Sequence, residues 1–436
     1  MVAAFGVTVV EADVLVIGGG PAGIAAAVRA SETARRVVLL DESPEVGGQI
    51  WRHRSRDTLP SPARAWLARL DASGARLLRG TSVVDVREEG DAFVVTAERN
   101  GVPVVAHAKA IVLATGARER FLPFPGWTLP GVIGVGAAQA LLKSGLSFAK
   151  QRVVIAGSGP LLLPVASALV TSGANVVLVA EQASRRAVLG FAIGLVTRPA
   201  TLLQAARYRA SFAGTSYRLG EWVSEARGDS VVREADITDG ATTRTIACDV
   251  LCVAFGLVPN VELAQLLGCT TVGGAVVVDE RQQTSCARVY CAGEPTGIGG
   301  MELAAVEGEL AGVCASGREA HARLVKRRNA LRKVAERMER VFAPRAELRE
   351  LATPDTIVCR CEDVALGAID RGWSMRKAKL YTRAGMGPCQ GRMCGTALEF
   401  LNGWPADTVR LPTEPALLST LTAESATASP TANQGA

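Results

Sequence analysis

The start of this chain places a hydrophobic strand, a glycine-rich turn and an alanine-rich helix in direct succession, an order that few folds accommodate. The strand is expected over Val14–Ile17, and the string GGGPAGIAAAVRA follows it with glycines in G-x-G-x-x-G spacing at Gly18, Gly20 and Gly23. Glycine in such a turn lets a pyrophosphate approach the helix N-terminus. The next strand ends at Asp41, whose carboxylate can bond a ribose hydroxyl. These features predict a dinucleotide-binding fold rather than a tight turn without a ligand.

A second strand, turn and helix unit lies further along the chain, in the string RVVIAGSGPLLLPVASALV. Gly157 and Gly159 keep the first two glycine positions, whereas Leu162 takes the third and Pro164 is expected to interrupt the helix start. The next strand ends at Glu181, which suits a free ribose 2′-hydroxyl. We expect an adenine nucleotide here, with NAD and ATP or ADP both open, and less support for turnover of NADH.

Segments outside the first glycine turn distinguish FAD from NAD as its ligand. Three of them are expected to join the turn, each at a loop or a strand end: Gly48 with Gln49, Thr115 with Gly116, and Gly293 with Glu294. An acid at a strand end can bond the ribitol of a flavin, and the helix that follows can direct its N-terminus at the cofactor. The sequence therefore predicts FAD in the first fold.

The last third of the chain carries four closely spaced cysteines, in the strings CRCEDV and TRAGMGPCQGRMCG. They are Cys359, Cys361, Cys389 and Cys394. Thiols beside glycine and charge, rather than in apolar runs, are typical of ligands. The spacings C-x-C and C-x4-C favour a [2Fe-2S] cluster over structural zinc, which prefers C-x2-C, while a disulfide pair is the third alternative.

Composition excludes several other classes of protein. The 436 residues are 48% hydrophobic and carry a net charge of +6 without a basic stripe containing aromatic residues, so we expect no nucleic-acid partner. The six remaining cysteines stand singly, which suits a reducing cytoplasm. Glycine and proline break the long apolar stretches, so no secretory or transmembrane segment is expected.

The chain offers little for acid–base or disulfide chemistry. No cysteine pair stands near either glycine turn, which excludes the chemistry of thioredoxin reductases. Of the three histidines, His53 alone could approach a flavin, and an ordinary loop position is the favoured interpretation. No residue is assigned as a catalytic acid or base.

Several longer strings resemble one family. VVLLDESPEVGGQIWR, LATGARER, FPGWTLPGV and AGSGPLLLPVA, together with the cysteine strings, are similar to the α subunits of heteromeric amino-acid and opine dehydrogenases. That family includes the opine oxidase A subunit, the hydrogen cyanide synthase B subunit and the α subunits of dye-linked proline and hydroxyproline dehydrogenases. The stretch between Cys361 and Cys389 is several residues shorter than the family pattern.

The resemblance implies an α/β fold of the two-dinucleotide-binding-domain flavoproteins, with the nucleotide domain inserted in the FAD domain. It also implies a small C-terminal helical [2Fe-2S] domain related to bacterioferritin-associated ferredoxin. The domains are then expected at 1–120 and 256–315 (FAD), 121–255 (second nucleotide), 316–354 (helical linker), 355–403 (cluster) and 404–436 (an extension, disordered at its end).

The resemblance further implies a partner. A flavin-bearing β subunit, similar to D-amino-acid oxidase, would oxidise the C–N bond of an amino acid, imino acid or opine. This chain would relay electrons through FAD and the cluster to an acceptor. A small γ subunit is left open, as is peripheral contact with the inner face of a membrane. The alternatives are a stand-alone NADH-dependent flavin and iron–sulfur reductase and a mainly structural nucleotide-binding subunit.

Overall fold

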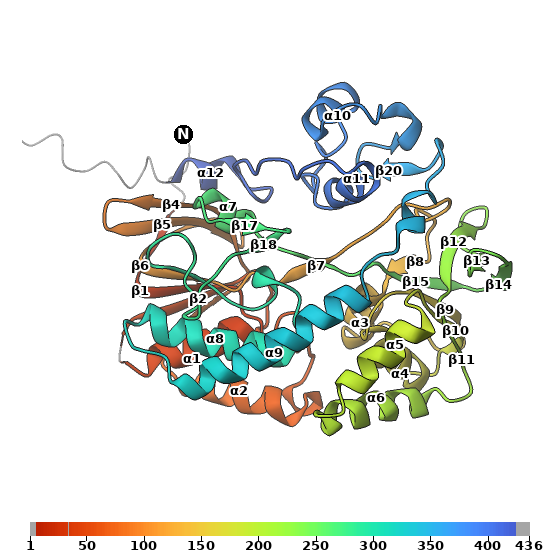
Figure 1. The fold of residues 1–436 in the computed structure, drawn as a ribbon. Helices are drawn as coiled ribbons and strands as arrows, with labels where there is room; N and C mark the ends of the chain where they lie inside the picture. The colour runs from red at the N-terminus through yellow and green to blue at the C-terminus, as the bar shows by residue number, and fades with distance from the viewer. Residues whose placement is uncertain (1–5, 34, 424–436) are drawn as a thin grey trace, which may run out of the picture. The chain divides into compact units, whose positions relative to one another are not determined.

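The computed structural model describes residues 6–33 and 35–423, which form two compact units. Within that range the first unit contains residues 6–118, 259–335 and 408–423, and the second contains residues 119–258 and 336–407. The second unit thus interrupts the first in the sequence, as the colours along the chain in Figure 1 show. The expected insertion of one α/β domain into another is confirmed.

A parallel sheet forms the centre of the first unit, in the strand order β3-β2-β1-β6, with β19 also paired to β6. The β1 and β2 strands have nearly continuous hydrophobic runs, because parallel strands of this kind are buried on both faces. The strands are β1 (Thr8–Ile17), β2 (Val37–Asp41), β3 (Arg76–Arg79), β6 (Val102–Leu113) and β19 (Val289–Cys291).

Two helices approach each other closely beside this sheet, α1 (Pro21–Ser31) and α8 (Met301–Ala315). A Cβ atom on Gly308 would lie 2.0 Å from the carbonyl oxygen of Ala22, and one on Gly312 would lie 2.2 Å from that of Ala26. Glycine at both positions therefore allows the two backbones to touch. The unit also contains helices α2 (Ser61–Asp71) and α7 (Glu262–Leu266) and the short strands β17 (Thr271–Val272) and β18 (Ala275–Val276).

An antiparallel layer extends the same sheet through β4 (Thr81–Glu89) and β5 (Ala92–Arg99). The C-terminal segment returns to it, since the backbone N–H of Thr413 donates to the carbonyl oxygen of Val84 at 3.0 Å, and α12 (Leu418–Leu421) follows. No pattern in the sequence predicts this packing. The end of the chain that we expect to be disordered falls mainly in 424–436, outside the described residues.

The second unit contains its own parallel sheet, in the order β11-β10-β9-β15-β8. Helix α4 begins at Leu162, so Pro164 lies in the first turn, where a missing N–H costs no intrahelical bond. Contrary to expectation, Pro164 therefore does not interrupt the helix. The strands are β8 (Val132–Gly134), β9 (Arg152–Gly157), β10 (Asn175–Glu181), β11 (Ser216–Leu219) and β15 (Val250–Ala254); the helices are α3 (Val135–Lys143), α4 (Leu162–Thr171), α5 (Arg185–Gly194) and α6 (Pro199–Ser211).

A small antiparallel sheet and a small helical part complete the second unit. The sheet consists of β12 (Trp222–Arg227), β13 (Glu234–Thr238) and β14 (Thr243–Ala247). The helical part contains β20 (Ile357–Cys359), β21 (Val364–Ala365), α10 (Met375–Thr382) and α11 (Cys394–Asn402). The short strands β7 (Ala117–Glu119) and β16 (Leu257–Pro259) pair where the chain passes from one unit to the other.

A single long helix, α9 (Ala322–Val341), occupies the basic segment where we predict one helix or two. Its sequence is strongly basic, and only Leu331 and Ala335 are fully buried. The amphipathic pattern is therefore real but narrow, because one stripe of the helix packs and the remaining surface is partly or fully exposed.

Candidate cofactor-binding sites

The parallel strands of the first unit end at one edge of the sheet, where the predicted FAD residues follow. In open α/β sheets, ligands bind in the crevice beyond the carboxyl ends of the strands. The last residues of these strands are Ile17 (β1), Asp41 (β2), Leu113 (β6) and Cys291 (β19). Segments that are far apart in the sequence therefore meet at this edge.

The first glycine turn has two positions that only glycine can occupy and one that faces open space. A Cβ atom on Gly18, which has φ of +105°, would lie 2.2 Å from the carbonyl oxygen of Ala114, and one on Gly23 would lie 1.7 Å from the carbonyl oxygen of Gly18. A Cβ atom on Gly20 would meet nothing nearer than the Cα atom of Gly48, at 4.0 Å. Gly20 is also the N-cap of α1, without a side-chain cap. The open space in front of this helix fits an anionic group.

The predicted loop after β2 lies directly on this turn. The backbone N–H of Gly47 donates to the carbonyl oxygen of Gly19 at 2.7 Å, which brings Gly48 beside the turn, while Gln49 is exposed. The Asp41 carboxylate accepts hydrogen bonds from the backbone N–H groups of Gly19 and of Ser43. Burial raises the pKa of the Asp41 carboxyl above its usual range.

The strand end at Thr115 and Gly116 is tied to a residue that sequence reasoning missed, Asn260. The Thr115 hydroxyl donates to the Asn260 carbonyl oxygen at 2.6 Å, and the Asn260 amide donates to the Thr115 carbonyl oxygen at 2.9 Å. The backbone N–H of Asn260 donates to the carbonyl oxygen of Gly116 at 3.0 Å. Asn260 thus fixes the path of the chain just beyond β6.

The downstream segment also reaches the first site. A Cβ atom on Gly293 would lie 2.9 Å from the Cβ atom of Ala22, in the first turn of α1. The Glu294 carboxylate accepts hydrogen bonds from the backbone N–H groups of Gly299 and Gly300, both at 3.0 Å. Glu294 therefore lies at the N-terminus of α8, and burial raises the pKa of its carboxyl.

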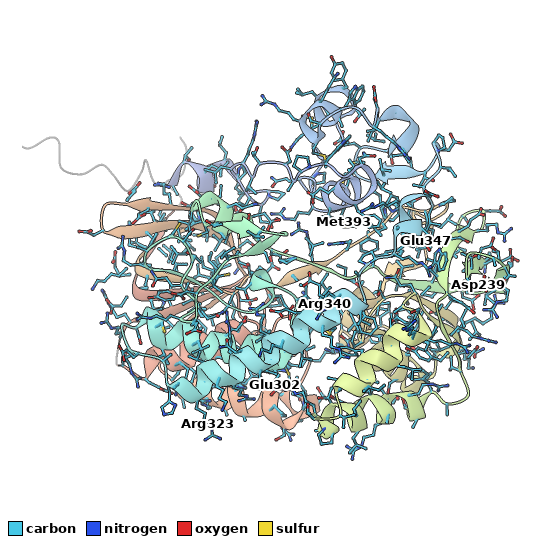
Figure 2. The ribbon with its side chains drawn as sticks, in the orientation of Figure 1. Asp239, Glu302, Arg323, Arg340, Glu347 and Met393 are labelled. Carbon is cyan, nitrogen blue, oxygen red and sulfur yellow. The ribbon has the colours of Figure 1, made fainter. Side chains whose placement is uncertain are left out.

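A buried ion pair beneath this segment was not predicted. Glu307 of α8 is fully buried and pairs with Arg332 of α9, whereas Glu302 in the first turn of the same helix, labelled in Figure 2, is exposed. Sequence offered one signal, a glutamate within the otherwise apolar run LAAVEGELAGV, because an isolated charge inside a buried helix requires a partner. The partner Arg332 could not be chosen among the many arginines of α9.

The loop that carries His53 also reaches the start of α8. The Trp51 indole N–H points at the Met301 sulfur at 3.1 Å, and Trp51 is buried. The His53 imidazole Nδ1 lies 2.7 Å from the carbonyl oxygen of Trp51. His53 thus bonds its own loop, and a role near a flavin stays a prediction.

The second glycine turn, in the other unit, resembles the first in one respect. A Cβ atom on Gly157 would lie 2.2 Å from the carbonyl oxygen of Ala254, while Gly159, with φ of +103°, faces open space. The buried Glu181 carboxylate accepts hydrogen bonds from the backbone N–H groups of Gly159 and Ala183, both at 2.8 Å. Burial raises the pKa of Glu181 from 4.5 to about 7.

A segment that follows α9 lies against the same turn. The Ser158 hydroxyl donates to the carbonyl oxygen of Phe342 at 2.7 Å, and the Gln182 amide donates to that of Ala343 at 3.1 Å. The Arg345 guanidinium stacks on the Trp222 ring, 3.7 Å from its centroid. Part of the edge where a nucleotide would bind is therefore already in contact with the chain's own residues 342–345.

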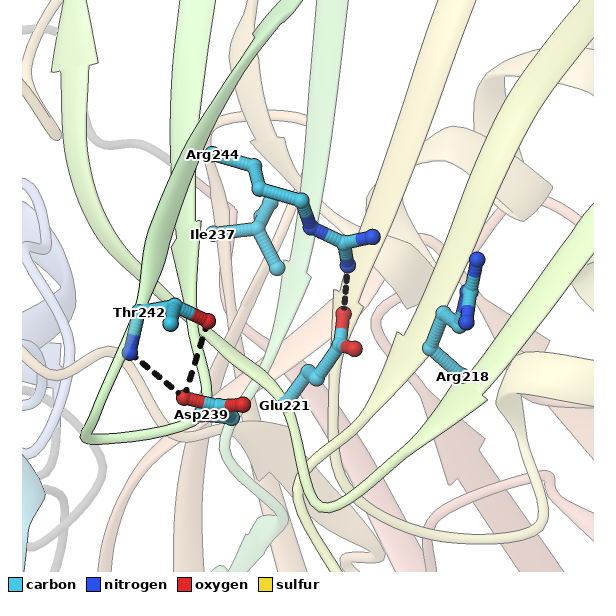
Figure 3. A pocket seen from close by; sticks show the side chains of 6 residues that line it. All are labelled: Arg218, Glu221, Ile237, Asp239, Thr242 and Arg244. Carbon is cyan, nitrogen blue, oxygen red and sulfur yellow. Dashed lines mark hydrogen bonds and ion pairs between the residues drawn. The ribbon is translucent and has the colours of Figure 1, made fainter.

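A small pocket of about 230 Å³ lies beside this edge, because the backbone N–H of Glu221 donates to the carbonyl oxygen of Glu181. Figure 3 shows Arg244 pointing at Glu221, with which it forms an ion pair. Asp239 accepts a hydrogen bond from the backbone N–H of Thr242 at 2.8 Å. With Arg218, the lining carries two guanidinium groups and two carboxylates. Its balanced charge gives no net attraction for a phosphate group.

The four C-terminal cysteines come together in the second unit. Cys359 ends β20 and Cys394 begins α11, and both thiols are buried, whereas Cys361 is exposed. Burial and then the neighbouring Cys389 thiol raise the pKa of Cys361, and burial and the neighbouring Cys359 thiol raise the pKa of Cys394. Residues separated by about thirty positions along the chain are thus neighbours, as their clustering in sequence predicts.

Glycines shape the space around these thiols. A Cβ atom on Gly387 would lie 2.3 Å from the Cβ atom of Cys361, and one on Gly385, with φ of +82°, would lie 3.8 Å from the Cys394 sulfur. Within residues 6–33 and 35–423, no group of three or more His, Cys, Asp or Glu side chains has the arrangement of a metal-ion site. The structure therefore shows the proximity of the thiols but not the geometry of bound ligands.

Comparison with known proteins places the chain in a family. Residues 12–311 match the family model described as pyridine nucleotide-disulphide oxidoreductase. The chain belongs to this family. It is 32% identical to the A subunit of opine oxidase from Agrobacterium tumefaciens (strain Ach5), over 88% of this chain and 84% of that protein. It is also 32% identical to hydrogen cyanide synthase subunit HcnB of Pseudomonas protegens, over 87% of this chain and 89% of that protein.

The fold of this pyridine nucleotide-disulphide oxidoreductase is similar to a solved structure as well. The crystal structure of L-proline dehydrogenase from P. horikoshii superposes with a TM-score of 0.69 at 22% identity and covers 95% of this chain and 80% of that one. The resemblance to opine oxidase and hydrogen cyanide synthase subunits is therefore confirmed. No helix in the described part of the chain is both long and apolar enough to cross a lipid bilayer.

The buried carboxyl of Glu181 predicts a pH dependence of stability. Its pKa rises from 4.5 to about 7 on folding, so the folded protein keeps a proton that the unfolded chain releases. The free energy of unfolding should therefore fall as the pH rises from about 4.5 to about 7, by up to roughly 3 kcal/mol from this group. Glu181→Gln should reduce that decline, as measured by urea unfolding across this pH range. An equal decline in both proteins would contradict the assignment.

Proposed function

We propose that the first unit binds FAD. The observation that carries the proposal is the convergence at one sheet edge of the glycine turn at Gly18, the loop at Gly48 and the segment at Gly293. The N-terminus of α1 would hold the pyrophosphate, Asp41 the ribose, and Glu294 the ribitol. The open space in front of Gly20 fits this assignment. Membership of the pyridine nucleotide-disulphide oxidoreductases supports it independently.

We further propose that the four C-terminal cysteines hold one [2Fe-2S] cluster. Two observations support this proposal over zinc: the C-x-C and C-x4-C spacings, and the glycines at Gly385 and Gly387 that leave room beside the thiols. All four thiols are free of disulfides. When bound, FAD and the cluster would together supply electron transfer, while the protein provides position and potential.

The chain would then serve as the electron-transfer subunit of a heteromeric dehydrogenase. The names of its relatives, opine oxidase and HcnB, support both a partner polypeptide and a C–N bond as the site of oxidation. Substrate would react at the flavin of that partner, a β subunit similar to D-amino-acid oxidase, and electrons would pass through this chain to an acceptor. The many free cysteines suit the reducing cytoplasm.

The second nucleotide fold supports a resident nucleotide better than hydride transfer. Glu181 is already bonded to two backbone amides, and residues 342–345 contact the turn at Ser158. These contacts oppose the alternative of a stand-alone NADH-dependent reductase, which needs space for a nicotinamide to enter and leave. A mainly structural subunit remains the second alternative.

Replacement of Gly20 tests the flavin site without disturbing the fold. Its backbone has an ordinary φ of −74°, and a Cβ atom there would clash with no protein atom. Gly20→Leu should therefore fold normally but fill the space in front of α1 and lose most bound FAD, measured as flavin absorbance per chain. Gly214→Leu, in open space in the other unit, is the matched control. Full flavin content in Gly20→Leu would place the cofactor elsewhere.

Replacement of Cys389 tests the cluster. Protein purified without oxygen should contain about two iron and two sulfide ions per chain. Cys389→Ser should lose both while keeping FAD, because the two sites lie in different units. Cys286→Ser, a partly buried thiol of the first unit, is the control. Stoichiometric zinc without sulfide in the unaltered protein would contradict the proposal.

Activity measurements test the role as a subunit. The isolated chain should not reduce an artificial dye with amino acids or opines, whereas co-expression with its flavin-bearing partner should give a stable complex that does. NADH should not bleach the flavin of the isolated chain, because the second fold is not a competent hydride donor site. Saturable dye reduction by the isolated chain would move catalysis to its own FAD, and rapid bleaching by NADH would favour the reductase alternative.

A further inference from the structure

The segment between β19 and α8 has a backbone that cannot hold its shape by local preference alone. Residues 293–300 contain three glycines with positive φ, +80° at Gly293, +122° at Gly297 and +81° at Gly300. Glycine is the residue with the greatest conformational entropy to lose on ordering. Such a segment needs contacts from outside to adopt one conformation, and this one forms part of the proposed flavin site.

Those contacts come from the buried Glu307 carboxylate and the Arg332 guanidinium. Glu307 accepts hydrogen bonds from the backbone N–H of Gly293 at 3.0 Å and from the Thr296 hydroxyl at 2.9 Å. Arg332 donates to the Thr296 carbonyl oxygen at 2.7 Å and to its hydroxyl at 2.8 Å, and it forms an ion pair with Glu307. A Cβ atom on Gly297 would lie 2.9 Å from the Arg332 guanidinium. The pair therefore grips both the start and the middle of the segment.

Burial makes this pair a rigid support. Glu307 is fully buried, the Arg332 side chain is 17% exposed, and a second guanidinium, that of Arg328, lies 3.8 Å from the Glu307 carboxylate. A buried carboxylate that loses its partner is costly, so the pair stays bonded and its geometry passes to the segment above it. The planar guanidinium also fixes the directions of its bonds to Thr296 and to Glu307.

We propose that Arg332, together with Glu307, is a positioning residue of the flavin site. The pair holds residues 293–300 in the conformation that receives FAD, and it thereby places Glu294 at the N-terminus of α8. This inference rests on the proposed binding of FAD in the first unit. It adds a residue of α9 to that site, outside all the segments that the glycine motifs identify.

Three variants separate positioning from stability. Arg332→Lys keeps the positive charge beside Glu307 but cannot make the same set of bonds to Thr296. The double variant Glu307→Gln with Arg332→Met removes both charges together, so that neither is left buried without a partner. Arg327→Met is the matched control, because Arg327 is exposed on the same helix and pairs at the surface with Glu302.

The measurements are the dissociation constant for FAD, the visible circular dichroism of bound FAD and the melting temperature of the FAD-free protein. Arg332→Lys should bind FAD about tenfold more weakly, because it loses a directed bond to the segment. The double variant should bind FAD more weakly still and change the dichroism of the flavin, while its FAD-free melting temperature stays close to that of the unaltered protein. Arg327→Met should match the unaltered protein in all three measurements.

Two results would overturn the inference. Unchanged FAD affinity in Arg332→Lys would remove the positioning role, and this variant decides that point even if the double variant fails to fold. Unchanged affinity and flavin dichroism in a folded double variant would do the same, since the pair would then support the fold alone. If the unaltered protein itself binds no FAD, the proposed function fails instead, and the two failures are therefore distinct.

Discussion

The first unit depends on a contact in which no side chain takes part. The turn after β1 presses on the end of β6 so closely that a Cβ atom on Gly18 would lie 2.2 Å from the Ala114 carbonyl oxygen. The same intimacy recurs where α8 crosses α1 at Gly308. These approaches bring backbone amides and helix N-termini to one edge of the sheet. Everything assigned to that site follows from distances that only glycine permits.

The parts of the site that could be predicted from sequence are those specified within a short stretch of chain. The turn at Gly18 and the strand ending at Asp41 each follow from local patterns of glycine, apolar runs and acids. The bonds of Asn260 to Thr115 and of Arg332 to Glu307 did not, because each joins segments whose meeting depends on the packed fold. Many arginines in α9 look equivalent in sequence, and only the contacts made in the fold distinguish Arg332.

The second unit illustrates the opposite limit. Its glycine turn and Glu181 lie together at a sheet edge, as their pattern predicts, but no pattern indicates the contacts from residues 342–345. The expectation that Pro164 disturbs α4 is wrong, since the effect of a proline depends on whether it stands inside the first turn or beyond it. The proximity of the cysteines is predictable because turn spacing is local, while their geometry as ligands is not.

Three carboxylates described above share a habit with a practical consequence. Asp41, Glu181 and Glu294 each accept hydrogen bonds from backbone amides of the turn or helix beside them. A ligand hydroxyl that reaches such an acid must share or replace an existing bond, so it adds little net hydrogen-bond energy. Equally, an empty site leaves none of these acids without a partner. The folded chain can therefore exist before its nucleotides arrive, so that synthesis of the polypeptide and loading with cofactor are separable events.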